Sequence, residues 1–355
     1  MHLLVIRTSA MGDVALTAPV LAVLVKKYPD ISVTLVTRPS FFPFFSAIKE
    51  LDLFAVDFKG RHKGLTGIFR LFNDLRKKYR SDHLADLHDV LRTKILRQLF
   101  RLSGTRVSVI NKGRSEKREL IKGRNKSALK HTVERYCDAF SDAGYPVVPE
   151  PGISFFSLNP SPETVSEPKL QKDVLNIGVA PFAKHALKMW PEENMIKLLT
   201  MISEKHNSRF WLFGGADETE GLNRMQESLP GSFVIAGRYD LNGELDLMQR
   251  LDLMISMDSS NMHMAALCGI KVISIWGATD PLAGFGAWQQ PDEYSVRIPV
   301  EELTCRPCTV YGKGKCRRKD FACMMWLTPE RVYEKILSFN LFNKTPFPVS
   351  PKGES

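Results

Sequence analysis

Segments typical of β-strands alternate with segments typical of α-helices along this chain of 355 residues, and the alternation stops once and then restarts. Alternating strands and amphipathic helices predict βαβ units and therefore a parallel sheet. The first series runs from His2 to Gly144, and the second starts at Leu175. Since a domain has roughly 100–200 residues, the length fits two domains. The expected fold is α/β, with two βα domains facing each other across a cleft.

Composition sets the expected domain boundaries. Residues 1–158 form the N-terminal domain, and the polar, proline-rich residues 159–173 form a linker. Residues 174–327 form the second domain and residues 328–343 a C-terminal helix, capped by Thr328 with Pro329 in its first turn. Residues 344–355 are expected to be a disordered tail.

The expected elements follow from hydrophobic periodicity. The expected strands are His2–Thr8, Ser32–Arg38, Phe54–Phe58, His83–His88, Arg106–Ile110, Leu175–Ala180, Arg209–Gly214, Phe233–Ala236, Leu253–Met257 and Lys271–Trp276. The expected helices are Gly12–Tyr28, Leu65–Tyr79, Arg92–Leu102, His131–Ala143, Glu192–His206, Asp217–Leu229, Glu244–Leu251 and Asn261–Cys268. The basic stretch Asn111–Lys130 is expected to be a long, mobile loop with a short helix at most.

Positive charge is concentrated in the first half of the chain. Residues 1–150 carry 27 Lys and Arg against 15 Asp and Glu, whereas the remaining residues carry 22 against 24. A basic face favours nucleic acid, anionic lipid headgroups or an acidic substrate, although an ordinary solvated surface explains it equally well. No window holds the ~20 apolar residues of a membrane span, and Arg7 comes too early for a signal peptide. We therefore expect a cytoplasmic protein.

The first candidate site is Arg7-Thr8-Ser9-Ala10-Met11-Gly12-Asp13, where the first strand gives way to a helix. Ligands of open α/β sheets bind at the carboxyl ends of the strands, and Gly12 permits a close approach there. Asp13 is either a helix cap or a catalytic carboxylate. Both interpretations stay open on this motif alone.

Two more candidate sites occupy strand-to-helix junctions of the second half. Lys188 precedes the helix signalled by Pro191, and a lysine beside a helix N-terminus suits a diphosphate. In Met257-Asp258-Ser259-Ser260-Asn261-Met262-His263, the carboxylate and hydroxyls of Asp258, Ser259 and Ser260 are placed to bind sugar or phosphate oxygens, and His263 lies in the following first turn. The alternatives are a solvated lysine and a structural histidine.

Four of the six cysteines, Cys305, Cys308, Cys316 and Cys323, lie close together in sequence. Four thiolates can bind zinc tetrahedrally, which would make a structural site, because no ligand position is left open for catalysis. Free or redox-active thiols are the other interpretation.

Three of these patterns together resemble glycosyltransferase family 9, the ADP-heptose:lipopolysaccharide heptosyltransferases. They are Arg-x-Ser-Ala-x-Gly-Asp near the start, Lys-x-Trp-Pro in mid-chain, and Asp-Ser-x-x-Met-His-x-Ala-Ala followed by Trp-Gly-Ala-Thr-Asp-Pro. They fall in the family's order across residues 1–330. The resemblance implies a GT-B fold, two Rossmann-like domains with the active site between them.

The resemblance also implies roles for individual residues. Asp13 matches the family's general base, and Lys188 matches the lysine that contacts the donor phosphates. Asp258, Ser259 and His263 match the donor-binding motif, from which Ser260 departs because glycine is more usual there. Glu218 matches an acidic residue near the nucleoside more loosely.

The implied function is an inverting, metal-independent transfer of a heptose or related sugar. The donor is an ADP-sugar, no cofactor is required, and the acceptor is a lipopolysaccharide inner-core or lipid A-type saccharide. The basic half then has a use: Lys117, Arg118, Lys122 and Arg124 are expected to bind this anionic, lipid-linked acceptor, with peripheral contact at the cytoplasmic face of the inner membrane.

Three other functions remain open at this point. They are a GT-B enzyme with another donor sugar, a nucleotide-sugar epimerase and, from a different class, a nucleic-acid-binding protein. No interleaving of aromatic and basic residues supports the last, and we expect no nucleic-acid partner.

Overall fold

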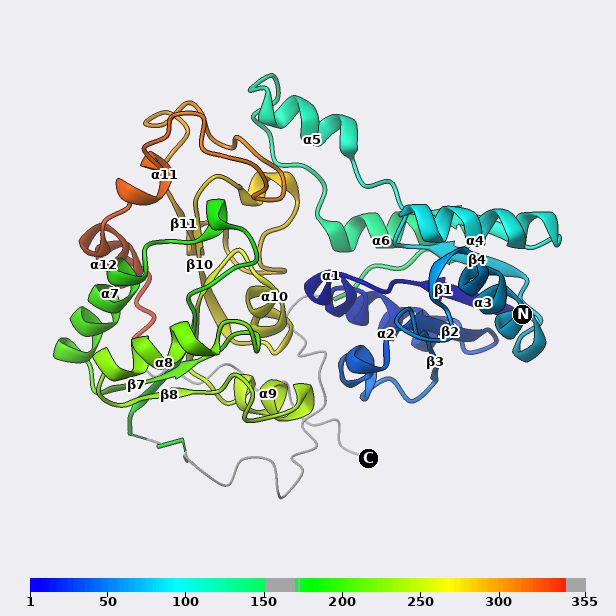
Figure 1. Cartoon of the computed structure of the whole chain (residues 1–355), viewed down its shortest axis with the longest axis horizontal. Helices are drawn as coiled ribbons and strands as arrows, with labels where there is room; N and C mark the ends of the chain where they lie inside the picture. The colour runs from blue at the N-terminus through cyan, green and yellow to red at the C-terminus, as the bar shows by residue number, and fades with distance from the viewer. Residues whose placement is uncertain (151–169, 172, 343–355) are drawn as a thin grey trace.

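The computed structural model describes residues 1–150, 170–171 and 173–342. Most of the expected linker and the whole expected tail lie outside these residues, and both stay predictions. Two lobes, each built on a parallel sheet, lie side by side (Figure 1). The predicted α/β class and the two facing βα units are thus present. None of the described helices is long and apolar enough to cross a membrane.

The N-terminal lobe has a five-stranded sheet in the order β3-β2-β1-β4-β5. Its strands are β1 (His2–Ile6), β2 (Ser32–Thr37), β3 (Leu51–Ala55), β4 (His83–Asp86) and β5 (Arg106–Val109). Successive side chains of a strand point to opposite faces. Leu4 and Ile6 accordingly pack against α3 (Gly64–Lys78) and α4 (Leu91–Leu102), whereas Leu3 and Val5 face the core formed with α1 (Met11–Ala15), α2 (Ala18–Lys27) and α6 (Thr132–Ser141).

The C-terminal lobe has a six-stranded sheet in the order β11-β10-β9-β6-β7-β8. Its strands are β6 (Leu175–Ala180), β7 (Ser208–Leu212), β8 (Ser232–Val234), β9 (Leu253–Met257), β10 (Lys271–Trp276) and β11 (Ser295–Arg297). One face is covered by α7 (Glu192–Lys205), α8 (Thr219–Ser228) and α12 (Pro329–Ser338), and the other by α9 (Leu241–Met248) and α10 (Ser260–Leu267). The core under α9 and α10 continues into the N-terminal lobe, so apolar packing joins the two lobes.

Short elements complete the chain between these layers. They are η1 (Pro39–Phe45), α5 (Arg114–Ile121), η2 (Ala186–Lys188), η3 (Pro281–Ala283), η4 (Asp292–Tyr294) and α11 (Ala322–Met325). The predicted loop at Asn111–Lys130 does contain one short helix, α5. Its N-cap is Gly113, and the φ of +61° there and the close approach of the Arg135 guanidinium favour glycine.

The single helix expected over Gly12–Tyr28 is wrong. The helix ends at Ala15 and a second one starts at Ala18, because the ring of Pro19 clashes with the carbonyl four residues earlier. The strand expected at Phe54–Phe58 forms three residues earlier, where Leu51 pairs with Val33 of β2.

The C-terminal helix expected over 328–343 is shorter than predicted. Thr328 does cap it, accepting a hydrogen bond from the Arg331 N–H at 3.3 Å, and Pro329 is its first residue. The helix ends at Ser338, and Asn340 follows with a left-handed φ of 53°. Asparagine is one of the residues that commonly ends a helix in this way.

Candidate active site

The carboxyl ends of both sheets open on one cavity of about 1630 Å³ that is lined from both lobes. Helices α1 and α10 face each other there, between the two sheets (Figure 1). A Cβ at Gly12 would lie 2.8 Å from Cδ2 of His263 and 3.3 Å from Cα of Ser260. Only glycine therefore permits α1 to approach α10 so closely. This contact brings the motif that contains Asp13 next to the motif that contains Asp258 and His263.

Asp13 lies in the first turn of α1 and lines the cavity, with 31% of its side chain exposed. Its Oδ2 lies 2.6 Å from the Arg7 guanidinium and accepts a hydrogen bond from the Ala10 N–H at 3.3 Å. Burial raises the pKa of Asp13, but Arg7, His263, the Ala10 N–H and Lys112 together hold it below its usual value. Asp13 thus supports the helix start and is also an ionised carboxylate facing the cavity.

Sequence analysis missed a histidine that supports the loop before Asp13. His88, after β4, lies 3.1 Å from the hydroxyl of Thr8 and 3.1 Å from that of Ser9. Burial, with Arg7 nearby, lowers the pKa of His88 to about 3, so the ring is neutral. The signal was available, since His88 is the last residue of the strand expected over His83–His88 and so lies at the same sheet edge as Asp13.

The donor-side candidates converge on Lys188 in η2. Its Nζ lies 2.7 Å from Oδ2 of Asp258, and the same carboxylate oxygen accepts a hydrogen bond from the Thr279 hydroxyl at 2.8 Å. Asp258 therefore orients Lys188. Ser259 is the N-cap of α10, and its hydroxyl lies 3.2 Å from that of Ser256.

His263 is buried in the first turn of α10, and its Nδ1 has no hydrogen-bond partner in the described part of the chain. Burial lowers the pKa of the ring, and Lys188 lowers it further against the opposing effect of Asp258 and Asp13. The neutral ring thus keeps one polar atom, Nδ1, without a partner among the described residues.

The helix N-terminus that opens on the cavity differs from the one expected. Ser259, Ser260 and Asn261, at the start of α10, line the cavity, whereas the start of α7 does not. The first turn of α7 also carries Glu192 and Glu193, whose negative charges offset the partial positive charge at the N-terminus of that helix. The free amides near Lys188 therefore come from α10.

A second segment missed by sequence analysis lies on Lys188. Gly312 has a φ of +76°, and a Cβ added there would lie 2.6 Å from Lys188 Cγ. The segment is anchored by the Cys308 N–H, which donates to the Ala278 carbonyl at 3.0 Å. Its Tyr311 lines the cavity and packs against Phe285, with ring centroids 5.8 Å apart.

Acidic residues line the end of the cavity beyond Lys188. Glu218 accepts a hydrogen bond from the Gly215 N–H at 2.8 Å, and burial raises the pKa of its carboxyl. Glu244, which sequence analysis did not single out, lines the same end, and burial with Asp240 nearby raises its pKa to about 7. Acidic side chains at this end suit hydroxyl groups and not phosphates.

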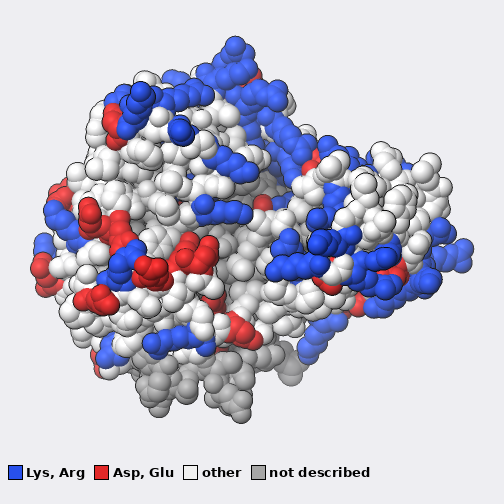
Figure 2. Space-filling view, in the orientation of Figure 1, with Lys and Arg blue, Asp and Glu red and all other residues white. Residues whose placement is uncertain are grey.

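The four basic residues expected to bind the acceptor do not share one face. Lys117 is only 4% exposed, lines the cavity, and has its Nζ 3.9 Å from the centre of the Phe285 ring. Arg118 is exposed, and Lys122 and Arg124 form ion pairs with Glu119 at 3.5 and 3.2 Å. The basic segment 111–130, which contains α5, is called the arm below. Figure 2 shows basic side chains gathered on this arm and on the N-terminal lobe, and acidic ones gathered on the C-terminal lobe.

The four clustered cysteines belong to the segment that carries Gly312. Cys305, Cys308 and Cys316 are half-buried and Cys323 is buried. Within the described residues, no group of three or more His, Cys, Asp or Glu side chains is arranged to hold a metal ion. The structural zinc site thus stays a prediction, as do the free thiols.

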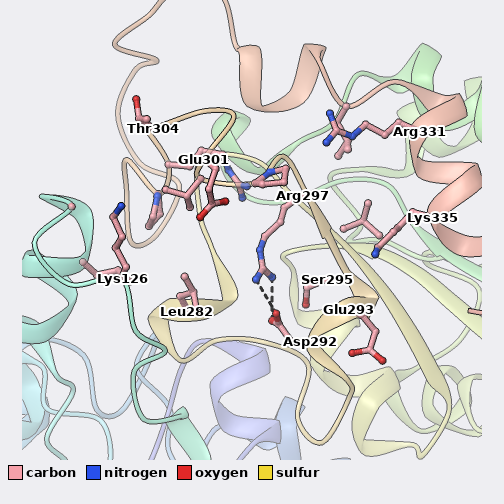
Figure 3. A pocket seen from close by; sticks show the side chains of 18 of the residues that line it. Lys126, Leu282, Asp292, Glu293, Ser295, Arg297, Glu301, Thr304, Arg331 and Lys335 are labelled. Carbon is pink, nitrogen blue, oxygen red and sulfur yellow. Dashed lines mark hydrogen bonds and ion pairs between the residues drawn. The ribbon is translucent and has the colours of Figure 1, made fainter. Parts of the chain in front are cut away.

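A second cavity of about 810 Å³ lies between the arm, β11 and α12 (Figure 3). Arg297 there pairs with Asp292 at 2.9 Å, and the buried Arg306 donates to the Gly277 and Thr279 carbonyls. None of the predicted site residues lines this cavity.

Two parallel-sheet lobes with a shared cavity at their carboxyl edges define the GT-B class. A heptosyltransferase from E. coli, solved with ADP, has the same fold. It superposes with a TM-score of 0.68 at 21% identity, covering 95% of this chain and 99% of that one.

The chain belongs to glycosyltransferase family 9, the heptosyltransferases, whose model matches residues 68–313. It is 24% identical over 370 aligned residues to lipopolysaccharide heptosyltransferase 1 of Pseudomonas aeruginosa, covering 97% of this chain and 99% of that protein. It is 26% identical over 165 residues to lipooligosaccharide heptosyltransferase 2 of Campylobacter jejuni, covering 45% of this chain. That match spans only about half the length of the Campylobacter protein, 49%.

Proposed function

We propose that this protein is an inverting glycosyltransferase that moves a heptose from an ADP-sugar to a lipopolysaccharide inner-core or lipid A-type acceptor. One observation carries the proposal. Asp13 of the first lobe and the Lys188–Asp258 pair of the second line the same cavity, although they are far apart in sequence. Family membership and the ADP bound to the E. coli relative support the choice of donor.

Each end of the cavity has a role in this proposal. Glu218 and Glu244 bind the nucleoside, because their carboxylates accept hydrogen bonds from its hydroxyl groups. Lys188 and the amides at the start of α10 bind the diphosphate, and His263 adds a hydrogen-bonding nitrogen. A helix N-terminus and a lysine stabilise a departing diphosphate without a metal, so we propose a metal-independent reaction that needs no cofactor.

The reaction is a single displacement. The acceptor hydroxyl gives its proton to the Asp13 carboxylate, and its oxygen bonds to the anomeric carbon as the bond from that carbon to the phosphate oxygen breaks. ADP leaves with the negative charge, and attack from the opposite face inverts the anomeric centre. General base catalysis of this kind contributes typically ~10²–10⁴-fold. Arg7 keeps Asp13 ionised and fixes its orientation.

We place the reaction in the cytoplasm, with the basic arm and N-terminal lobe in peripheral contact with the inner membrane. The charge distribution supports this, because basic residues near an anionic surface are attracted to it. No nucleic-acid partner is part of the proposal.

A donor screen tests the function. Nucleotide release is measured from ADP-heptose, other ADP-sugars and UDP-sugars, with and without a lipid A-type saccharide acceptor. We expect release from ADP-heptose that depends on the acceptor. Release from another sugar would favour a transferase with a different donor, and interconversion of the sugar without release would favour an epimerase. Salt-sensitive binding to RNA without either reaction would favour the nucleic-acid alternative.

A further inference from the structure

Three large apolar side chains are exposed at one edge of the N-terminal lobe. Leu65 and Phe69, one turn apart on α3, are 65% and 51% exposed, and Leu91, the first residue of α4, is 76% exposed. Other residues of α3 form the stripe that packs on the sheet, so these three side chains contribute little to the core. A group of exposed apolar side chains with charged residues around it is typical of a binding surface.

The three side chains belong to one surface. Since α3 follows β3 and α4 follows β4, both helices start at the carboxyl edge of the N-terminal sheet. The two helices also pack against each other (Figure 1). The guanidinium carbon of Arg92, in α4, lies 3.7 Å from the centre of the Phe58 ring, in the loop before α3. The starts of α3 and α4 therefore adjoin.

Positively charged side chains surround the apolar ones. They come from the segments that follow β2, β3 and β4 and are Arg38, Lys59, Lys63 and Arg92. Within the described residues, none of these four forms an ion pair within 4.0 Å. The nearby carboxylates are already occupied, because Asp57 accepts hydrogen bonds from three N–H groups of its own loop and Asp74 pairs with Arg61 at 2.7 Å. The rim thus keeps a net positive charge.

An apolar group within a basic rim suits the surface of an anionic bilayer. Leucine and phenylalanine side chains enter the boundary between headgroups and acyl chains, while lysine and arginine remain at the level of the phosphates. A protein partner would instead have to present acidic residues around an apolar pocket. The proposed acceptor is linked to a lipid, so an anionic membrane is the partner that the proposed reaction brings to this protein.

The surface borders the acceptor side of the active-site cavity. Asp13 follows β1, which lies between β2 and β4 in the sheet, so the rim residues that follow these two strands flank it. Helix η1, which starts directly after Arg38, contacts α1 and contributes Pro39 and Ser40 to the cavity lining. A membrane bound at this surface would hold a lipid-linked acceptor close to the proposed base.

We infer that Leu65, Phe69 and Leu91, with the basic rim around them, dock this protein on an anionic membrane and insert below the lipid headgroups. The inference rests on the proposed function, and it adds which part of the N-terminal lobe touches the bilayer and that the contact is partly apolar. Salt screens the attraction of the arm and the rim, but not the burial of the apolar side chains. Part of the binding is therefore resistant to salt.

The test is sedimentation of the protein with vesicles, without donor or acceptor. The vesicles contain phosphatidylglycerol and phosphatidylcholine, and pure phosphatidylcholine vesicles serve for comparison. We expect the wild type to prefer the anionic vesicles. Replacing Leu65, Phe69 and Leu91 together by Ser should weaken binding roughly tenfold to a hundredfold at both low and high salt. Replacing Lys59 and Lys63 by Gln should weaken it about fivefold per charge, and only at low salt.

Leu102 provides the matched control. It is the last residue of α4, at the opposite edge of the sheet, and is 87% exposed. Leu102→Ser should therefore bind vesicles like the wild type, and all these variants should keep its unfolding temperature, because the replaced side chains are exposed. Should the triple variant fail to fold, Phe69→Trp and Leu102→Trp test the same contact. Lipids brominated in their acyl chains should quench the fluorescence of the added tryptophan in Phe69→Trp and not in Leu102→Trp.

Three results would overturn the docking surface. They are equal vesicle binding by the triple variant and the wild type, an equal loss in Leu102→Ser, and a wild type that does not bind anionic vesicles, which would favour a protein partner. Transfer to an acceptor saccharide stripped of its acyl chains should be the same in the triple variant and the wild type. Vesicle docking by a protein that transfers no sugar would keep the surface and reject the proposed transfer reaction.

Discussion

Replacing Gly312 with alanine tests whether the cysteine-bearing segment holds Lys188, the proposed contact to the donor phosphate, in place. The new Cβ would lie 2.6 Å from Lys188 Cγ and 3.0 Å from Cδ and Cε. Since carbon atoms pack at about 3.5–4.0 Å, the lysine stem must move by roughly 1 Å. Cγ is close to the backbone, so rotation about the outer bonds of the side chain does not relieve the contact. The ion pair with Asp258, 2.7 Å in the native protein, and the proposed contact to the donor phosphate should both weaken.

The expected effect follows from the lost charge-assisted contact. Such contacts are worth roughly 1.5–3 kcal/mol, which corresponds to about 10- to 150-fold weaker ADP binding. Alanine also has to adopt the positive φ of Gly312, at roughly 1–2 kcal/mol in stability. Gly314→Ala is the matched control, because Gly314 has a φ of +105° in the same segment but no atom within 4 Å of an added Cβ.

Calorimetric titration of ADP into the wild type and both variants separates the two effects, with thermal unfolding measured alongside. We expect both variants to lose stability but only Gly312→Ala to lose affinity for ADP. Equal ADP affinity in Gly312→Ala and the wild type, or an equal loss in both variants, would show that Gly312 does not position Lys188.

Three further predictions concern metal, membrane charge and pH. Excess EDTA should leave the rate of nucleotide release unchanged; a loss restored by Mg²⁺ would contradict the mechanism, and a slow loss restored only by Zn²⁺ would place structural zinc at the cysteines. Changing Arg118, Lys122 and Arg124 to Gln should weaken binding of an acceptor embedded in anionic vesicles by ~1 kcal/mol for each charge not already paired with Glu119. That effect should shrink as salt rises, since exposed charges are screened over ~8–10 Å, and identical saturation curves at low salt would refute it. The raised pKa of Glu244, about 7, means that the folded state holds its proton more tightly than the unfolded state. Its contribution to stability is therefore fully present below about pH 4.5 and is lost as pH rises towards 7. Over that pH range, the unfolding temperature should fall less for Glu244→Gln than for the wild type.

The elements that sequence predicted best are buried on both faces. Leu175–Ala180, Leu253–Met257 and Lys271–Trp276 form strands with the expected bounds, because a continuous apolar run between turn residues leaves few alternatives. The end of α1 before Pro19 could have been predicted, because the proline itself is the local signal. The position of β3, three residues earlier than expected, depends on its pairing with β2, and hydrophobic periodicity does not encode that pairing.

The candidate site was predictable only in part. Strand-to-helix junctions put Asp13 at the carboxyl edge of the first sheet and Lys188 and His263 at that of the second, and the structure brings all three to one cavity. Gly312 and Phe285 come from irregular segments whose path is set by tertiary contacts, so no sequence pattern pointed to them. On α5, a helix turns about 100° per residue, which buries Lys117 and exposes Arg118. Treating the segment as a loop hid that distinction.

The most direct test of the central claim is the rate of acceptor-dependent ADP release by Asp13→Asn. Asparagine keeps the shape of the side chain and an oxygen for Arg7 and the Ala10 N–H, but it does not take the proton of the acceptor hydroxyl. At saturating donor and acceptor, the account predicts a rate at least ~100-fold below that of the wild type, with ADP affinity and unfolding temperature nearly unchanged. A rate close to that of the wild type would contradict it and leave Asp13 as a helix-capping residue.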